Sequence, residues 1–89
     1  MLRVEKEVIV KTDQGLHARP AALFVQIANK FDSEITVRKG PESVNGKSIM
    51  GILMLAAEKG SKLIVSVEGD DAKEASVELV NFLTNNVSE

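Results

Sequence analysis

The chain has 89 residues and a formal net charge of -2, with 44 % apolar and 27 % charged residues. This length fits one domain spanning residues 1–89, and the balance of residue types is that of a folded globule rather than a disordered segment. A domain of this size buries only roughly 60–65 % of its unfolded surface, so a deep substrate cavity would consume much of its core.

Several classes of protein are disfavoured by what the composition lacks. Without cysteine there are no disulfides and no thiolate metal sites, and we expect neither a metal nor another cofactor. Mild acidity and an aromatic content of three phenylalanines argue against nucleic-acid binding. We see no signal peptide and no run long enough to cross a bilayer, so we expect a cytoplasmic protein that works through its surface.

The N-terminal third predicts a strand followed by an amphipathic helix. One face of the first extended segment is apolar, through Val4, Val8 and Val10. Asp13-Gln14-Gly15 is typical of a turn. The segment from Ala18 to Lys30 then shows helical periodicity, and Pro20 fits near its start. The apolar stripe of this helix is Ala21, Phe24, Val25 and Ala28.

The middle of the chain predicts a hairpin and a second helix. Glu34 to Lys39 alternates as a strand, Gly40-Pro41 breaks it, and residues 42–45 return as its partner. Ser48 is a good N-cap for a helix over Ile49–Leu55, and Gly60 is expected to mark its C-terminal stop.

The last third predicts a strand over Leu63–Val67 and a third helix. Asp71 with Glu74 forms a variant of the capping box, and the charged residues around it are expected to be a solvated helix start. The helix continues through Ala75, Leu79, Val80 and Leu83, and residues 85–89 are expected to fray. The order β-α-β-β-α-β-α favours an α+β fold with one sheet and the helices on a single face. Phe24, Phe31 and Phe82 are assigned to the core or its edge.

The most informative segment is Gly15-Leu16-His17-Ala18-Arg19-Pro20. It places the only histidine, His17, at the start of the first predicted helix, where free N–H groups and the helix dipole favour an anion. Arg19 adds a guanidinium suited to phosphate oxygens, and histidine is a competent nucleophile near neutral pH.

The simplest alternative is a loop histidine that caps the helix or is merely solvated. Arg19 beside the same helix end favours a function, and the chain has no second histidine or cysteine with which to build a metal site or triad. An imidazole with an anion cradle and no general-base partner suits phosphoryl acceptance better than hydrolysis.

Two separate motifs carry a family resemblance. Gly15-Leu16-His17-Ala18-Arg19-Pro20-Ala21, a short helix, and later Asn45-Gly46-Lys47-Ser48-Ile49-Met50-Gly51 together resemble HPr. HPr is the histidine-containing phosphocarrier family of the bacterial phosphoenolpyruvate-dependent sugar phosphotransferase system (PTS). The resemblance covers nearly the whole chain; Gln14 and Gly46 stand where other members carry different residues.

The resemblance implies an open-faced β-sandwich with a four-stranded antiparallel sheet in the order 1-4-2-3 and three helices on one face. It also implies that enzyme I phosphorylates His17 on Nδ1 and that the group passes to EIIA domains of sugar permeases. Arg19 matches the family's active-site arginine. Such a chain is a carrier rather than an enzyme, and we expect a monomer that binds no nucleic acid and does not insert directly into a membrane.

The resemblance also implies a regulatory site and a partner surface. Ser48 matches the serine that HPr kinase/phosphorylase modifies. The predicted second helix is apolar all round, so in a two-layer domain some of its side chains must be exposed. The family's pattern selects Ile49, Met50 and Leu53, with Ala18 and Ala22 of the first helix, as the partner surface, while Ile52 and Leu55 face the sheet.

Three alternatives remain beside the sugar-transport carrier. One is a regulatory binding module acting through Ser48 and the apolar patch, as in the family's histidine-lacking paralogue; His17 speaks against it. Another is a carrier of a nitrogen-related phosphotransfer branch. The third is a nucleotide-binding loop at Gly46-Lys47-Ser48, but five residues instead of four separate Gly40 from Gly46.

Overall fold

The computed structural model describes residues 2–84, so the expected fraying of residues 85–89 lies outside the described part. The element order is the predicted β-α-β-β-α-β-α. The elements are β1 Arg3–Ile9, α1 Ala18–Ala28, β2 Glu34–Lys39, β3 Glu42–Asn45, α2 Ile49–Leu55, β4 Lys62–Glu68 and α3 Ala72–Thr84. No helix in this range is long and apolar enough to cross a membrane.

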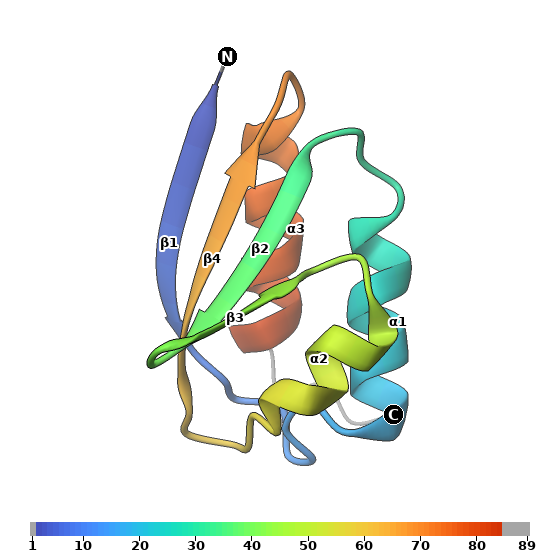
Figure 1. The fold of residues 1–89 in the computed structure, drawn as a ribbon, viewed down its shortest axis with the longest axis vertical. Coiled ribbons are helices and arrows are strands. Elements are labelled where there is room, and N and C mark those ends of the chain that lie inside the picture. Colours follow the sequence, from blue (N-terminus) through green and yellow to red (C-terminus); the bar gives the residue numbers. More distant parts are fainter. Residues whose placement is uncertain (1, 85–89) are drawn as a thin grey trace.

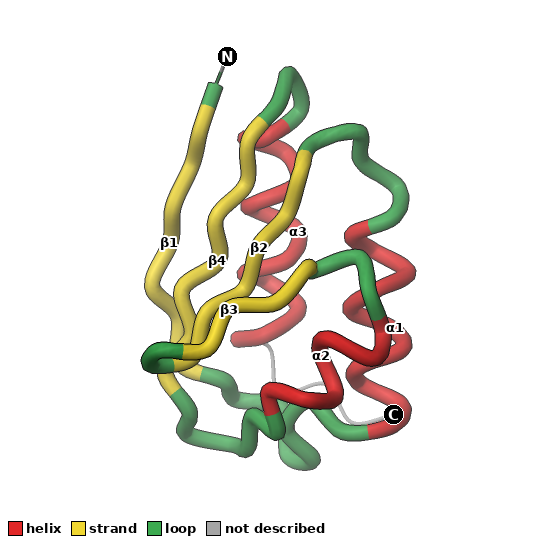
Figure 2. The backbone as a smooth tube through the Cα atoms, in the orientation of Figure 1, coloured by secondary structure: helices red, strands yellow, loops and turns green. Residues whose placement is uncertain are grey.

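The four strands form one antiparallel sheet in the order β1-β4-β2-β3, as the resemblance implied. The three helices cover one face of this sheet and leave the other face open (Figure 1). Long connections bring β4 between β1 and β2, and only β2 and β3 form a tight hairpin (Figure 2). The α+β, open-faced architecture is therefore confirmed.

The core lies between the sheet and the helices. Val37 of β2 pairs with Val65 of β4, and both side chains are fully buried because alternate residues of a strand point to the same face. Phe24 of α1 and Leu79 of α3 close the core from the helix side. Phe31 and Phe82 are partly buried against it, as expected of core-edge residues.

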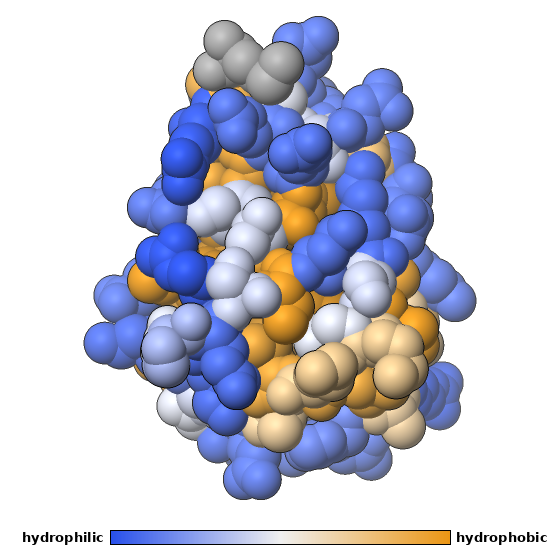
Figure 3. All heavy atoms as spheres, viewed as in Figure 1, coloured by the Kyte–Doolittle hydropathy of each residue, from blue (hydrophilic) through white to orange (hydrophobic). Residues whose placement is uncertain are grey.

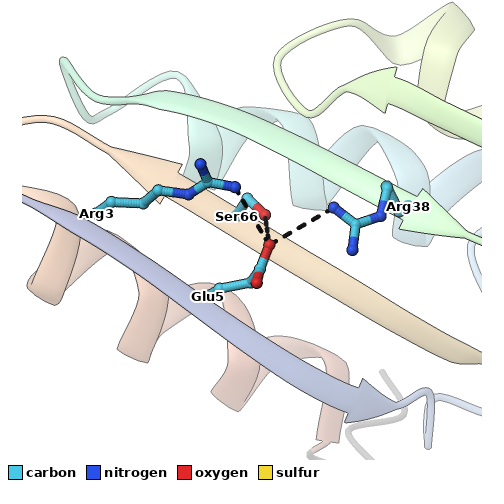
Figure 4. Close-up of polar contacts among 4 residues, drawn as sticks. All are labelled: Arg3, Glu5, Arg38 and Ser66. Atoms are coloured by element: carbon cyan, nitrogen blue, oxygen red, sulfur yellow. Dashed lines mark hydrogen bonds and ion pairs between the residues drawn. The ribbon is translucent and has the colours of Figure 1, made fainter.

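The open face of the sheet carries a polar cluster centred on Glu5 (Figure 4). One carboxylate oxygen accepts a hydrogen bond from the Ser66 hydroxyl at 2.8 Å. The same oxygen lies 3.3 Å from a guanidinium nitrogen of Arg3 and 3.5 Å from one of Arg38. The Ser66 hydrogen bond, with smaller contributions from the two guanidinium groups, lowers the pKa of Glu5. This cluster lies on the opposite side of the sheet from the helices.

The end of α2 differs from the prediction. The residue after the helix is Ala56, which adopts the left-handed conformation with φ 51°, whereas Gly60 lies further on and donates its N–H to Val10 O at 2.8 Å. A left-handed residue with a Cβ costs about 1–2 kcal/mol, which is why the sequence favours Gly60 over Ala56 as the stop of this helix. Lys39 Nζ offsets part of this cost by donating to the carbonyl oxygens of Leu55 at 3.1 Å and Ala56 at 3.4 Å.

The capping box at α3 was also predicted wrongly. The Asp71 carboxylate accepts hydrogen bonds from the backbone N–H of Asp32 at 2.8 Å and from the N–H and hydroxyl of Ser33. Within residues 2–84, no hydrogen bond joins it to Glu74. The Ser33 hydroxyl, followed by the Asp32 N–H, lowers the pKa of Asp71. Asp71 therefore fastens the α1–β2 connection to the start of α3 instead of being merely solvated.

Candidate functional site

His17 is the N-cap of α1 and is exposed. Its backbone is extended, and its carbonyl accepts the first helical hydrogen bond from Ala21 N at 3.0 Å. The imidazole itself makes no capping hydrogen bond. The capping alternative for the side chain is therefore wrong, and the ring is presented to solvent at the positive end of an eleven-residue helix.

Arg19 lies in the first turn of the same helix and is exposed. None of the hydrogen bonds or ion pairs formed within residues 2–84 involves its guanidinium. The first turn contains no acidic residue that would neutralise it. The structure thus places an uncompensated cation and an exposed imidazole two residues apart at one helix end.

The first turn of α1 also has backbone N–H groups to offer. Pro20 has none, and Ala21 donates to His17 O. Ala18 and Arg19 accordingly supply the N–H groups that lack an intrahelical partner. Backbone N–H groups and a guanidinium at a helix N-terminus form an environment that favours phosphate oxygens.

Ser48 is confirmed as the N-cap of α2. Its side-chain oxygen accepts a hydrogen bond from Gly51 N at 3.1 Å. The preceding residue is anchored to the end of α1, because Lys47 Nζ donates to Phe31 O at 2.6 Å and Lys47 O accepts from Asn29. Ser48 is half-buried at this junction of α1 and α2.

The outer surface of α2 is apolar and exposed. Ile49, Met50 and Leu53 are exposed by 42 %, 64 % and 36 %, whereas Ile52 and Leu55 are buried, so the predicted division of this helix is confirmed. We call Ile49, Met50 and Leu53 the α2 patch. Figure 3 shows apolar side chains gathered over this helix in the lower part of the view.

Other residues of the predicted partner surface lie on α1, against which α2 packs. Ala18 is exposed and Ala22 is half-buried. Met54 was not predicted to be part of the surface, yet it is 72 % exposed. Its position four residues after Met50 places it on the same side of the helix, which is the signal that could have identified it.

The nucleotide-loop alternative is excluded by the hairpin. Residues 42–45 between the two glycines form β3, which pairs with β2 and cannot wrap around a phosphate. Gly46 is buried against Ile35, where an added Cβ would lie 2.4 Å from a side-chain methyl. In residues 2–84 no three histidine, cysteine, aspartate or glutamate side chains are grouped to hold a metal ion.

Comparisons with known proteins agree with this geometry. The family model described as "PTS HPr component phosphorylation site" matches residues 4–85. The solved structure of phosphocarrier protein HPr from Bacillus anthracis superposes with a TM-score of 0.90 at 47 % identity, covering 93 % of this chain and 99 % of that one.

This chain belongs to the HPr family. Among curated relatives it is 52 % identical to the HPr-like protein Crh of Halalkalibacterium halodurans, over 90 % of this chain and 95 % of that protein. It is 41 % identical to phosphocarrier protein HPr of Borreliella burgdorferi, over 90 % and 93 %. It is therefore an HPr-family phosphocarrier protein, and the HPr phosphocarrier family is not a family of catalytic enzymes.

Proposed function

We propose that this chain carries phosphoryl groups in the phosphoenolpyruvate-dependent sugar phosphotransferase system. Enzyme I donates the group to His17, and EIIA domains of sugar permeases receive it. The observation that carries this proposal is an exposed imidazole, free of any capping role, beside the unpaired guanidinium of Arg19. Both the fold and the family assignment support it.

The proposed step is an in-line displacement. Nδ1 of neutral His17 forms a bond to phosphorus while the bond from phosphorus to the donor histidine of enzyme I breaks. Arg19 and the first-turn N–H groups offset charge on the equatorial oxygens. Each charge-assisted contact contributes about 1.5–3 kcal/mol, and a carrier must form few of them because the group has to leave again.

Docking is proposed to use the α2 patch together with Ala18 and Ala22. An exposed apolar surface containing a flexible methionine can fit more than one partner, as a carrier that meets enzyme I and several EIIA domains requires. We also propose Ser48 as a regulatory phosphorylation site for HPr kinase/phosphorylase, since it adjoins this patch in the chain.

We propose the monomer as the acting form. Solved relatives include an HPr dimer from Thermoanaerobacter tengcongensis and Crh of Bacillus subtilis as a swapped dimer. The oligomeric state of this chain is therefore best measured by light scattering at the concentrations used for transfer assays. Transfer by a dimeric species alone would contradict the monomer proposal.

A second candidate is a regulatory module that acts through Ser48 and the α2 patch. It is favoured by the identity to the HPr-like Crh proteins, which reaches 52 % for Halalkalibacterium halodurans and 42 % for Bacillus subtilis. Replacing His17 by Ala separates the two proposals, because a pure binding module keeps its function while a carrier loses it. A carrier of the nitrogen-related branch is distinguished by offering the phosphorylated chain to EIIA domains of each branch.

A further inference from the structure

The backbone ahead of His17 is held by the segment that follows α2. Leu16 donates its N–H to Ala57 O at 2.8 Å, and both residues are fully buried. A second hydrogen bond, from Gly60 N to Val10 O at 2.8 Å, joins the same two segments. The residue that directly precedes His17 is therefore hydrogen-bonded to the segment that follows α2.

Glycine at position 15 lets the loop ahead of His17 approach the backbone of residues 57–58 more closely than a residue with a Cβ would allow. Its φ is +62°, and an added Cβ would lie 2.4 Å from Ala57 O and 2.7 Å from the Cα of Glu58. Thr12 holds the turn from the other side, since its hydroxyl donates to Gly15 O at 3.0 Å and its carbonyl accepts from Gly15 N at 3.0 Å. The loop consequently has little freedom to move independently of residues 57–58.

The position of Ala57 depends in turn on how α2 ends. The left-handed turn at Ala56 directs the chain from the helix to the His17 loop. Lys39 reaches across from the end of β2 and donates to Leu55 O at 3.1 Å and Ala56 O at 3.4 Å. Its charge lies at the negative end of the helix, and no other side chain within residues 2–84 donates to these two carbonyls.

We propose that Lys39 is a positioning residue for phosphoryl transfer. By fixing the end of α2, it holds Ala57 against Leu16 and thereby keeps His17 in the orientation that accepts the group. Lys39 touches neither the phosphoryl group nor the partner in this role. The proposal rests on the proposed function for its chemical consequence, but its structural part can be measured without any partner.

The test compares Lys39→Met, which keeps the apolar stem and removes the ammonium group, with Lys62→Met. Lys62 is an exposed lysine that pairs with Glu7 at 3.5 Å, so the control removes the same charge from the same sheet. Amide hydrogen exchange followed by NMR should show about tenfold faster exchange at Leu16 in Lys39→Met, with Val67 unchanged. Unchanged exchange at Leu16, or equal acceleration at Val67, would overturn the proposal.

The chemical measurement is the rate of phosphorylation by enzyme I. Lys39→Met should lower kcat by roughly threefold or more and leave KM within about twofold of the parent. Lys39→Arg should keep kcat near the parent value because it retains a cation at the helix end. Ala56→Gly should restore it in the Lys39→Met background, because glycine adopts the left-handed turn without penalty.

The outcomes separate this proposal from the proposed function. A raised KM at unchanged kcat would place Lys39 in the docking surface and overturn its positioning role. The positioning role is also overturned if Lys39→Arg lowers kcat as much as Lys39→Met does and Ala56→Gly fails to restore kcat in the Lys39→Met background. If the parent protein accepts no phosphate from enzyme I, the proposed function fails, whereas the exchange of Leu16 still decides whether Lys39 fixes the loop.

Discussion

The hydroxyl oxygen of Ser48 accepts a hydrogen bond from the backbone N–H of Gly51 at 3.1 Å, so the proposed regulatory atom is also the cap of α2. Gly51 sits close to the hairpin, where an added Cβ would lie 3.2 Å from the Cβ of Val44. A phosphoryl group on Ser48 would add negative charge at the positive end of α2, which the helix tolerates. Its effect should therefore fall on partners rather than on the fold.

Ser48→Ala and Ser48→Asp separate the two roles of this residue. Ser48→Ala should lower the free energy of unfolding by about 0.5–2 kcal/mol and leave His17 phosphorylation near the parent rate. Ser48→Asp should keep the fold and slow phosphorylation by enzyme I several-fold, because charge and hydration are placed beside the α2 patch. Ser43→Asp on the exposed part of β3 is the matched control for added charge. Parent-like transfer by Ser48→Asp would leave only the capping role.

Arg19→Glu should slow phosphoryl transfer strongly while moving the melting temperature by no more than about 4 °C. The reason is that Arg19 is exposed and makes no hydrogen bond or ion pair with the other described residues. Arg19→Lys should be intermediate, since the point charge survives but the bidentate fork does not. Lys73→Glu, in the first turn of α3, is the control for charge reversal. Normal transfer with a large loss of stability would make Arg19 structural.

Met50→Asp should weaken binding to enzyme I and to EIIA domains together, with the fold intact. Met50 is 64 % exposed at the α2 patch, so a carboxylate there disturbs docking and little else. Val77→Asp on α3 provides the control, because Val77 is also an exposed apolar residue, at 54 %, outside the proposed surface. Binding measured by calorimetry should distinguish them, and equal affinities for the two variants would remove the patch from the docking surface.

Asp71→Asn should destabilise the protein at about pH 7, and the difference from the parent should shrink at about pH 3 or below. Hydrogen bonds from Ser33 and Asp32 lower the pKa of Asp71 below its usual 3.8 in the folded state. The resulting stabilisation is present above that usual value and is lost as the pH falls through the lower, folded-state pKa. Urea unfolding at both pH values measures this, with the exposed neighbour Asp70→Asn as control. A pH-independent difference would contradict the hydrogen-bond assignment.

Local patterns predicted most of the fold because they act over a few residues. Alternation located β2 to the residue, the Gly40-Pro41 break located β3 as its hairpin partner, and the Ser48 cap with an apolar run located α2. The stop of α2 and the role of Asp71 were missed because each depends on a distant partner. Lys39 lies 17 residues from Ala56, whose carbonyl oxygen it bonds, and Ser33 lies 38 residues from the carboxylate it bonds.

The candidate site was predictable for a similar reason, since His17 and Arg19 are close in sequence. The sequence could not indicate that the loop ahead of His17 is hydrogen-bonded to Ala57. That contact requires a main-chain hydrogen bond over 41 positions and a glycine at position 15 with no room for a Cβ.

Incubation with enzyme I and phosphoenolpyruvate, followed by intact-mass measurement of the parent protein and of His17→Ala, is the most direct test of phosphoryl transfer by this chain. The parent should gain the mass of one phosphoryl group, labile in acid and stable in alkali, while His17→Ala stays unmodified and folded. A parent protein that gains no phosphoryl group, or a folded His17→Ala variant that still gains one, would contradict transfer through His17.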